Sequence, residues 1–146
     1  MKWLLPLALL TACDALPKDF GGTLVRVERE HSFRVGLIAE GGRSRCPDVA
    51  PAFLARVAAA TGASPQVTEG AAEPLLGALR NGELDLVLGE LDPSSPWKTE
   101  VAILEPLVSG CPGEVEFSAI ARNGENRWVV LLENAGRAFR RSGGRA

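Results

Sequence analysis

The chain of 146 residues has no tyrosine and a single histidine, and aromatic residues occupy only 5% of its positions. Proteins that bind nucleic acids use aromatic platforms for the bases and a clustered basic face for the phosphates. This chain has a formal net charge of −2. Its one basic cluster, Arg137 with Arg140 and Arg141, falls at a predicted helix end, where cations complement the helix dipole. We therefore expect no nucleic-acid partner.

Catalytic and metal-binding motifs are also missing. The sequence has no Gly-x-Ser-x-Gly, no phosphate-binding loop and no His-Glu-x-x-His pattern. His31 precedes a predicted strand without a patterned ligand partner, which favours a solvent-facing turn residue over a metal ligand. Five carboxylates are spread along the chain, and the sequence does not predict a buried pair among them. They are Glu69, Glu73, Glu83, Asp85 and Glu90. We expect no enzyme activity, no metal and no cofactor.

The N-terminal apolar run is short. Lys2 precedes Trp3–Leu10, and Leu10-Thr11-Ala12-Cys13 follows directly. A run of this length cannot cross a bilayer of roughly 30 Å, so it is a targeting segment. The pattern resembles the lipobox of bacterial lipoproteins in all four positions, which implies cleavage before Cys13 and a diacylglyceryl group on its sulfur. An ordinary secretory signal with a chance cysteine is the alternative.

The lipobox implies an organisation and a compartment. Residues 1–12 would be a signal peptide, 13–22 a lipidated tether and 23–146 a single folded lobe. The mature protein would lie in the periplasm, anchored to a membrane by its lipid. Asp14 resembles the inner-membrane retention signal of some Gram-negative lipoproteins.

Two cysteines remain if Cys13 carries lipid, and thiols outside the cytoplasm tend to pair. We predict a disulfide between Cys46 and Cys111. Closing its loop would restrict the unfolded chain by about 4 kcal/mol in the chain-entropy model. Two separate buried thiols are the alternative.

Apolar periodicity predicts alternating helices and strands. We expect helices at 23–29, 49–61, 73–81 and 127–141, and strands at 33–39, 65–68, 84–88, 101–104 and 115–121. Asp48 and Asn126 are the expected caps of the second and fourth helices, and 106–113 is an expected Pro/Gly-rich link. The apolar run 129–132 could instead be a strand.

This alternation predicts an α/β fold, a single three-layer lobe whose mostly parallel sheet carries helices on both faces. In such sheets ligands bind beyond the carboxyl ends of the strands. The loops expected there are 40–47 and 90–98.

Five short fragments, in this order, resemble the first lobe of type II periplasmic solute-binding proteins of the polar amino-acid ABC transporter family. They are Gly22-Thr23-Leu24 with Arg34-Val35-Gly36, Pro47-Asp48-Val49-Ala50, Asn81-Gly82-Glu83, Glu100-Val101 through Glu105-Pro106-Leu107, and Ile120-Ala121-Arg122-Asn123-Gly124. The resemblance implies a small polar solute, amino-acid-like or anionic, and a membrane permease as partner.

Two departures from the family stand out. Only a short link separates Pro106 from Ile120, where the family has its second lobe, so the second wall of a cleft would come from a homodimer or a permease. Trp97 occupies the position of the family's arginine for the substrate carboxylate, and the neighbouring Lys98 offers only a point charge.

The candidate ligand residues come from the two loops. Arg43, Ser44 and Arg45 could cradle an anion with backbone N–H groups and guanidinium groups. Ser94 and Ser95 supply hydroxyls, although two flanking prolines also fit a plain turn, and Trp97 and Lys98 complete the candidate set. A second hypothesis is an accessory lipoprotein of a membrane complex that has lost ligand binding.

Overall fold

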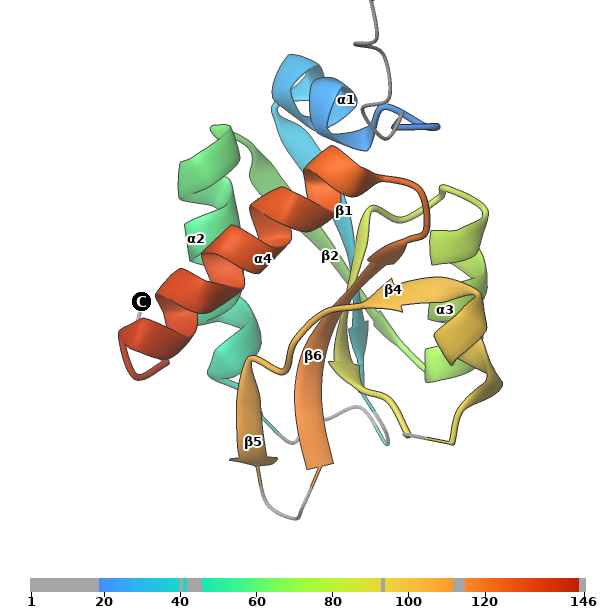
Figure 1. The fold of residues 1–146 in the computed structure, drawn as a ribbon, viewed down its shortest axis with the longest axis vertical. Coiled ribbons are helices and arrows are strands. Elements are labelled where there is room, and N and C mark those ends of the chain that lie inside the picture. The colour runs from blue at the N-terminus through green and yellow to red at the C-terminus, as the bar shows by residue number, and fades with distance from the viewer. Residues whose placement is uncertain (1–18, 40, 42–45, 93, 112–114, 145–146) are drawn as a thin grey trace, which may run out of the picture.

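Helices and strands alternate along the chain in the computed structural model, which describes residues 19–39, 41, 46–92, 94–111 and 115–144 (Figure 1). The alternation confirms the predicted α/β class. In chain order the elements are α1 (Thr23–Glu30), β1 (Ser32–Ile38), α2 (Val49–Thr61), β2 (Ser64–Gly70), α3 (Ala72–Arg80), β3 (Leu86–Glu90), the 3-10 helix η1 (Pro96–Thr99), β4 (Val101–Ile103), β5 (Val108–Cys111), β6 (Val115–Arg122) and α4 (Asn126–Arg141).

The strands form one sheet in the order β2-β1-β3-β6-β4, and β5 also pairs with β6. Strand β1 is parallel to β2 and β3, whereas β6 is antiparallel to β3, β4 and β5. It follows that β4 and β5 run in the same direction as β1, and that β6 alone is reversed. The prediction of a mostly parallel sheet is confirmed.

Helices cover both faces of the sheet, which gives the predicted three layers (Figure 1). On one face, Phe53 of α2 and Trp128 of α4 are buried in the larger apolar cluster, with residues of α1. On the other face, Leu76 and Leu79 of α3 centre the smaller cluster. The rings of Phe33 and Trp128 meet edge to face at 6.0 Å and join β1 to α4.

The helix ends match the sequence more closely than their caps do. Helix α2 ends at Thr61, and Gly62 adopts φ 67° and donates its N–H to the Ala58 carbonyl at 2.8 Å. Asp48 occupies the N-cap position, yet its side chain makes no capping hydrogen bond. Helix α4 begins at Asn126, so Asn126 is not its cap, and the strand alternative for 129–132 is wrong.

Strand β5 lies inside the segment expected to be a plain link. It pairs with β6 through a register irregularity between Ser109 and Cys111, so β5 and β6 form a hairpin where the resembled family has its second lobe. Val108 is the one strongly β-favouring residue of this strand, so pairing with β6 holds β5 more than intrinsic propensity does.

A buried carboxylate, Asp85, holds together the end of the lobe where α1 and the head of α4 meet, which we name the α1 end. It accepts hydrogen bonds from the Arg34 backbone N–H at 2.7 Å, from Arg34 Nη2 at 2.8 Å and from Arg26. Burial alone would raise the pKa of Asp85, but the Arg34 and Arg26 donors outweigh it and lower the pKa.

Glu125 is the second buried carboxylate of the α1 end. It accepts from the backbone N–H groups of Gly21 at 2.6 Å and Thr23 at 2.9 Å, and from Arg122 Nη2 at 2.6 Å. Burial again opposes ionisation, but these donors lower the pKa of Glu125. Nearby, His31 is exposed at the C-cap of α1 with φ 52°, as expected for a turn residue.

Candidate functional site

The carboxyl ends of β1, β2 and β3 meet at one edge of the sheet, opposite the α1 end (Figure 1). We name this edge, with the following segment Asp92–Lys98, the carboxyl edge. The register places Ile38 beside Gly70, and the Ala39 N–H donates to the Gly70 carbonyl at 3.0 Å. The edge is the place where a parallel sheet offers a ligand crevice.

Gly89 sets the close approach of β1 and β3 at this edge. Its φ is 151°, and a Cβ built on it would lie 2.6 Å from Ile38 Cβ. Any larger residue would push the two strands apart. The backbones of β1 and β3 are thus closely packed immediately before the candidate segment.

The first predicted ligand loop cannot be placed against this edge. Arg43, Ser44 and Arg45 lie outside the described residues. Gly41, which precedes them, is exposed and adopts φ 64°. The predicted anion cradle stays a prediction.

The second predicted loop is a turn closed by its own polar groups. The Ser94 N–H and Ser94 Oγ donate to Asp92 Oδ1 at 2.7 and 2.6 Å, and Ser95 Oγ accepts from the Trp97 N–H at 3.4 Å. The bonds from Ser94 lower the pKa of Asp92. Both hydroxyls therefore make hydrogen bonds within the turn. Each oxygen has two lone pairs, so it can still accept a hydrogen bond from a ligand.

Trp97 packs toward α3. Its Nε1 donates to Glu73 Oε1 at 2.9 Å, and the Arg80 guanidinium carbon lies 5.3 Å from the ring centroid. The indole also packs against the smaller apolar cluster. Trp97, at the position of the family's arginine, thus connects η1 to α3. The neighbouring Lys98 is exposed.

Sequence reasoning missed this role of Glu73 and Arg80. The two residues are seven positions apart on α3, which places them on one helix face. That spacing was the available signal, but nothing in the sequence indicated that Trp97 would reach the same face. Arg80 also lies 3.8 Å from Glu100, so a small polar network joins α3 to the segment before β4.

Within the described part of the chain, no group of three or more His, Cys, Asp or Glu side chains could hold a metal ion. No helix within the same residues is both long and apolar enough to span a bilayer.

No protein-family model matches the sequence, and no curated protein matches it significantly. Solved structures do match the fold. A mutant of the arginine-bound form of domain 1 of TmArgBP, from T. maritima, gives a TM-score of 0.65 at 16% identity, over 81% of this chain and 98% of that chain. An arginine-bound amino-acid ABC transporter substrate-binding protein from Streptococcus pneumoniae gives 0.66 at 7% identity, over 84% and 93%.

An ancestral cationic amino-acid solute-binding protein also matches, with a TM-score of 0.64 at 11% identity, over 83% of this chain and 94% of that chain. These three are binding proteins, and the ancestral one, AncCDT-1, is also described as a precursor of cyclohexadienyl dehydratase. The chain therefore has the fold of a single domain of type II amino-acid-binding proteins, as its sequence fragments predicted.

Proposed function

We propose that the chain is a lipid-anchored, extracytoplasmic solute-binding lobe that takes a small polar solute, amino-acid-like or anionic, at its carboxyl edge. The observation that carries the proposal is the match to domain 1 of TmArgBP, which was solved as the arginine-bound form of that domain. A single domain of this fold has therefore held a ligand without its second lobe.

The groups proposed to contact the solute are those of the two loops. Lys98 is exposed at the carboxyl edge and would supply the positive charge, while Ser94 and Ser95 would accept hydrogen bonds. Arg43, Ser44 and Arg45 complete the proposed set. Trp97 stands where the family has an arginine, and its indole is held against α3. Lys98 would therefore offer a weaker point charge in place of a bidentate guanidinium.

One lobe buries less of a small ligand than two lobes do, while the entropic cost of association stays the same. We expect a dissociation constant of roughly 10 μM to 1 mM. A second copy of the chain or a membrane permease would tighten binding by supplying the missing wall.

The test is titration calorimetry of the mature, lipidated chain in detergent against a panel of amino acids and organic anions. Lys98→Ala should weaken binding of an anionic solute roughly tenfold, because it removes the proposed cation. Arg137→Ala, an exposed cation on α4, is the matched control and should bind normally. No heat at millimolar concentration of any compound would contradict the proposal and favour the accessory-lipoprotein hypothesis.

The lipid anchor and the disulfide are separate parts of the proposal. Cys46 is buried in the larger apolar cluster, against which Val108 of β5 also packs, and β5 ends at Cys111. This shared cluster supports the Cys46–Cys111 pairing. Mass spectrometry of the non-reduced mature protein should find that linked peptide and a diacylglyceryl group on Cys13. Free thiols would refute the first, and an unmodified N-terminus would refute the second.

A further inference from the structure

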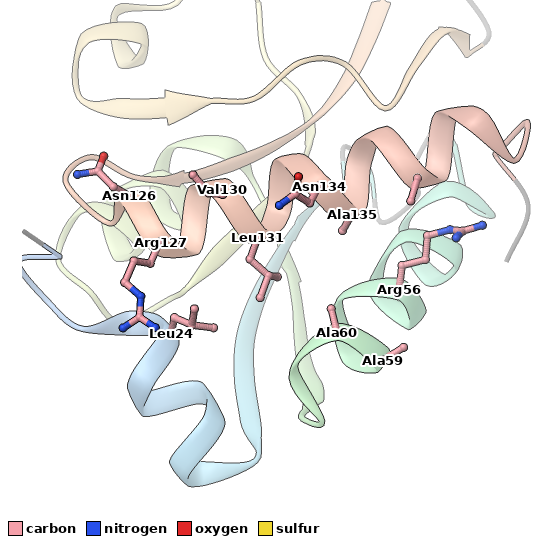
Figure 2. Close-up of a pocket in the computed structure, with 11 residues that line it drawn as sticks. Leu24, Arg56, Ala59, Ala60, Asn126, Arg127, Val130, Leu131, Asn134 and Ala135 are labelled. Carbon is pink, nitrogen blue, oxygen red and sulfur yellow. The ribbon is translucent and has the colours of Figure 1, made fainter. Parts of the chain in front are cut away.

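An apolar groove of about 1010 Å³ runs between α1, α2 and α4, away from the carboxyl edge (Figure 2). Leu24 of α1, Ala59 and Ala60 of α2, and Val130, Leu131 and Ala135 of α4 line it. Arg127 and Arg56 border it at the α1 and α2 ends of the view. Nothing in the proposed solute site uses this groove.

The chain enters the lobe beside the groove. Asp19 Oδ1 accepts from the Arg127 N–H at 2.8 Å, and Asp19 Oδ2 lies 3.8 Å from Arg127 Nε. The Phe20 N–H donates to the Gly124 carbonyl at 3.3 Å. These contacts fix residues 19 and 20 at the head of α4. Cys13, the proposed lipidation site, is six residues earlier in the sequence, and six residues span at most about 20 Å.

Exposed apolar side chains gather on the elements at this entry point. Val130 of α4, which lines the groove, is 57% exposed and Val25 of α1 is 51% exposed, whereas Phe20, which is 86% exposed, lines a separate hollow with Arg80 and Arg122. Among the described residues, the two other large apolar side chains with high exposure are Val67 on β2 and Ile103 on β4. Exposed apolar groups near the point where a lipid-bearing tether would enter the lobe are typical of a surface that enters the headgroup region of a bilayer.

The charges around the groove favour the same partner. The side chains that line the groove include two arginines, Arg56 and Arg127, and no carboxylate, in a chain whose net charge is −2. A basic face is complementary to anionic phospholipid headgroups. Two copies of the chain meeting through this face would instead bring like charges together, which disfavours a dimer across the groove.

We propose that the face formed by α1, the groove and the head of α4 lies against the bilayer and holds the lobe in one orientation. The inference rests on the proposed lipid anchor at Cys13. Strand β1 starts beside α1 and runs away from it for seven residues, a length of about 23 Å. Contact through the α1 end therefore points the carboxyl edge away from the membrane, toward solute in the aqueous phase.

Site-specific photocrosslinking tests the orientation. The mature, lipidated chain would be reconstituted into vesicles of phosphatidylethanolamine with phosphatidylglycerol. It would carry p-benzoylphenylalanine in place of Val130. The matched control carries it in place of Val67, which is similarly exposed on β2. We expect phospholipid adducts at position 130 to exceed those at position 67 roughly fivefold. Equal yields, an adduct between two chains, or an adduct with the acyl chains on Cys13 would overturn the inference.

A second measurement covers the case in which the bulky residue disturbs folding. When the protein binds vesicles, hydrogen exchange should slow in the first turns of α4 but not on a surface away from the membrane, such as β2. Val130→Asp should remove that protection, while Val67→Asp should leave it. Unchanged protection in Val130→Asp would overturn the inference. Mass spectrometry of the N-terminal peptide separates the two failures. A lipidated chain without these signals refutes only the orientation, whereas an unlipidated chain refutes the anchor.

Discussion

The two ends of the lobe differ in what their polar contacts connect. At the α1 end, Asp85, which directly precedes β3, accepts hydrogen bonds from Arg26 and Arg34, more than fifty positions away. Glu125 accepts one from the Gly21 N–H across 104 positions. At the carboxyl edge, Ser94 bonds to Asp92 only two positions away, and the bond from Trp97 to Glu73 spans 24 positions but is exposed. A buried bond between distant segments stabilises the fold more than an exposed bond or a bond within a turn does. The side-chain bonds of the α1 end should therefore stabilise the lobe more than those of the carboxyl edge do.

Asp85→Ala should produce the largest loss of stability. It removes the buried acceptor of two arginines and of a backbone N–H, and so takes from these partly buried donors the carboxylate that they share. Deleting one partner of a buried ion pair costs about 3 kcal/mol or more. Urea unfolding at neutral pH measures the change. Glu30→Ala is the matched control, because Glu30 also pairs with Arg26 but on the surface, and it should cost less than about 1 kcal/mol. Equal losses would break the comparison.

Glu125→Ala should cost less, about 2 kcal/mol, because two of its three bonds, from the Gly21 N–H and from Arg122, are only partly buried. It should also release residues 19–23 from the lobe, which hydrogen exchange at the Thr23 amide would show as faster exchange. Slow exchange at Thr23 in this variant would mean that the Asp19 contacts alone hold the segment.

Acid should weaken the α1 end by protonating both carboxylates. The folded-state pKa values of Asp85 and Glu125 are lowered, so below the unfolded-state pKa values near 4 the unfolded chain binds more protons than the folded chain. Their stabilising contribution is therefore complete above those unfolded-state values and is lost as pH falls through the folded ones. Protonation keeps the side chain in place, so the effect is smaller than deletion.

Unfolding midpoints measured from pH 6 down to pH 3 check this dependence. Asp85→Asn should flatten the slope, because the amide does not titrate, while Asp92→Asn at the exposed turn should change it little. An unchanged slope in Asp85→Asn would assign the acid sensitivity to other groups.

The contrast between the ends also explains what the sequence could predict. Periodicity located the helices and most strands because apolar residues such as Leu76, Leu79 and Phe53 recur on one face of each element. Strand β5 escaped prediction because its pairing with β6, rather than its residues, defines it. The sequence also gave no sign that Asp85 would be buried with two arginines, since their partners come from distant elements.

The candidate site was less predictable than the fold for a related reason. Ser94 and Ser95 were correctly placed in one loop beyond a strand, but hydroxyls in a turn and hydroxyls in a ligand site have the same sequence pattern. The contacts of Trp97 with Glu73 depend on how η1 packs against α3, and no local pattern encodes that packing.

Trp97→Phe should have the smallest effect, a loss of about 0.5–1 kcal/mol, since the ring still packs on Arg80 and only the hydrogen bond to Glu73 disappears. A double-mutant cycle with Glu73→Ala, which removes the acceptor, isolates that bond, and a coupling energy near zero would show that the indole N–H is solvated rather than bonded. Because the bond links the carboxyl edge to α3 and not to the α1 end, losing it should leave the acid slope unchanged. A change in that slope would mean that the two ends unfold as one polar network, which would contradict the separation on which the comparison depends.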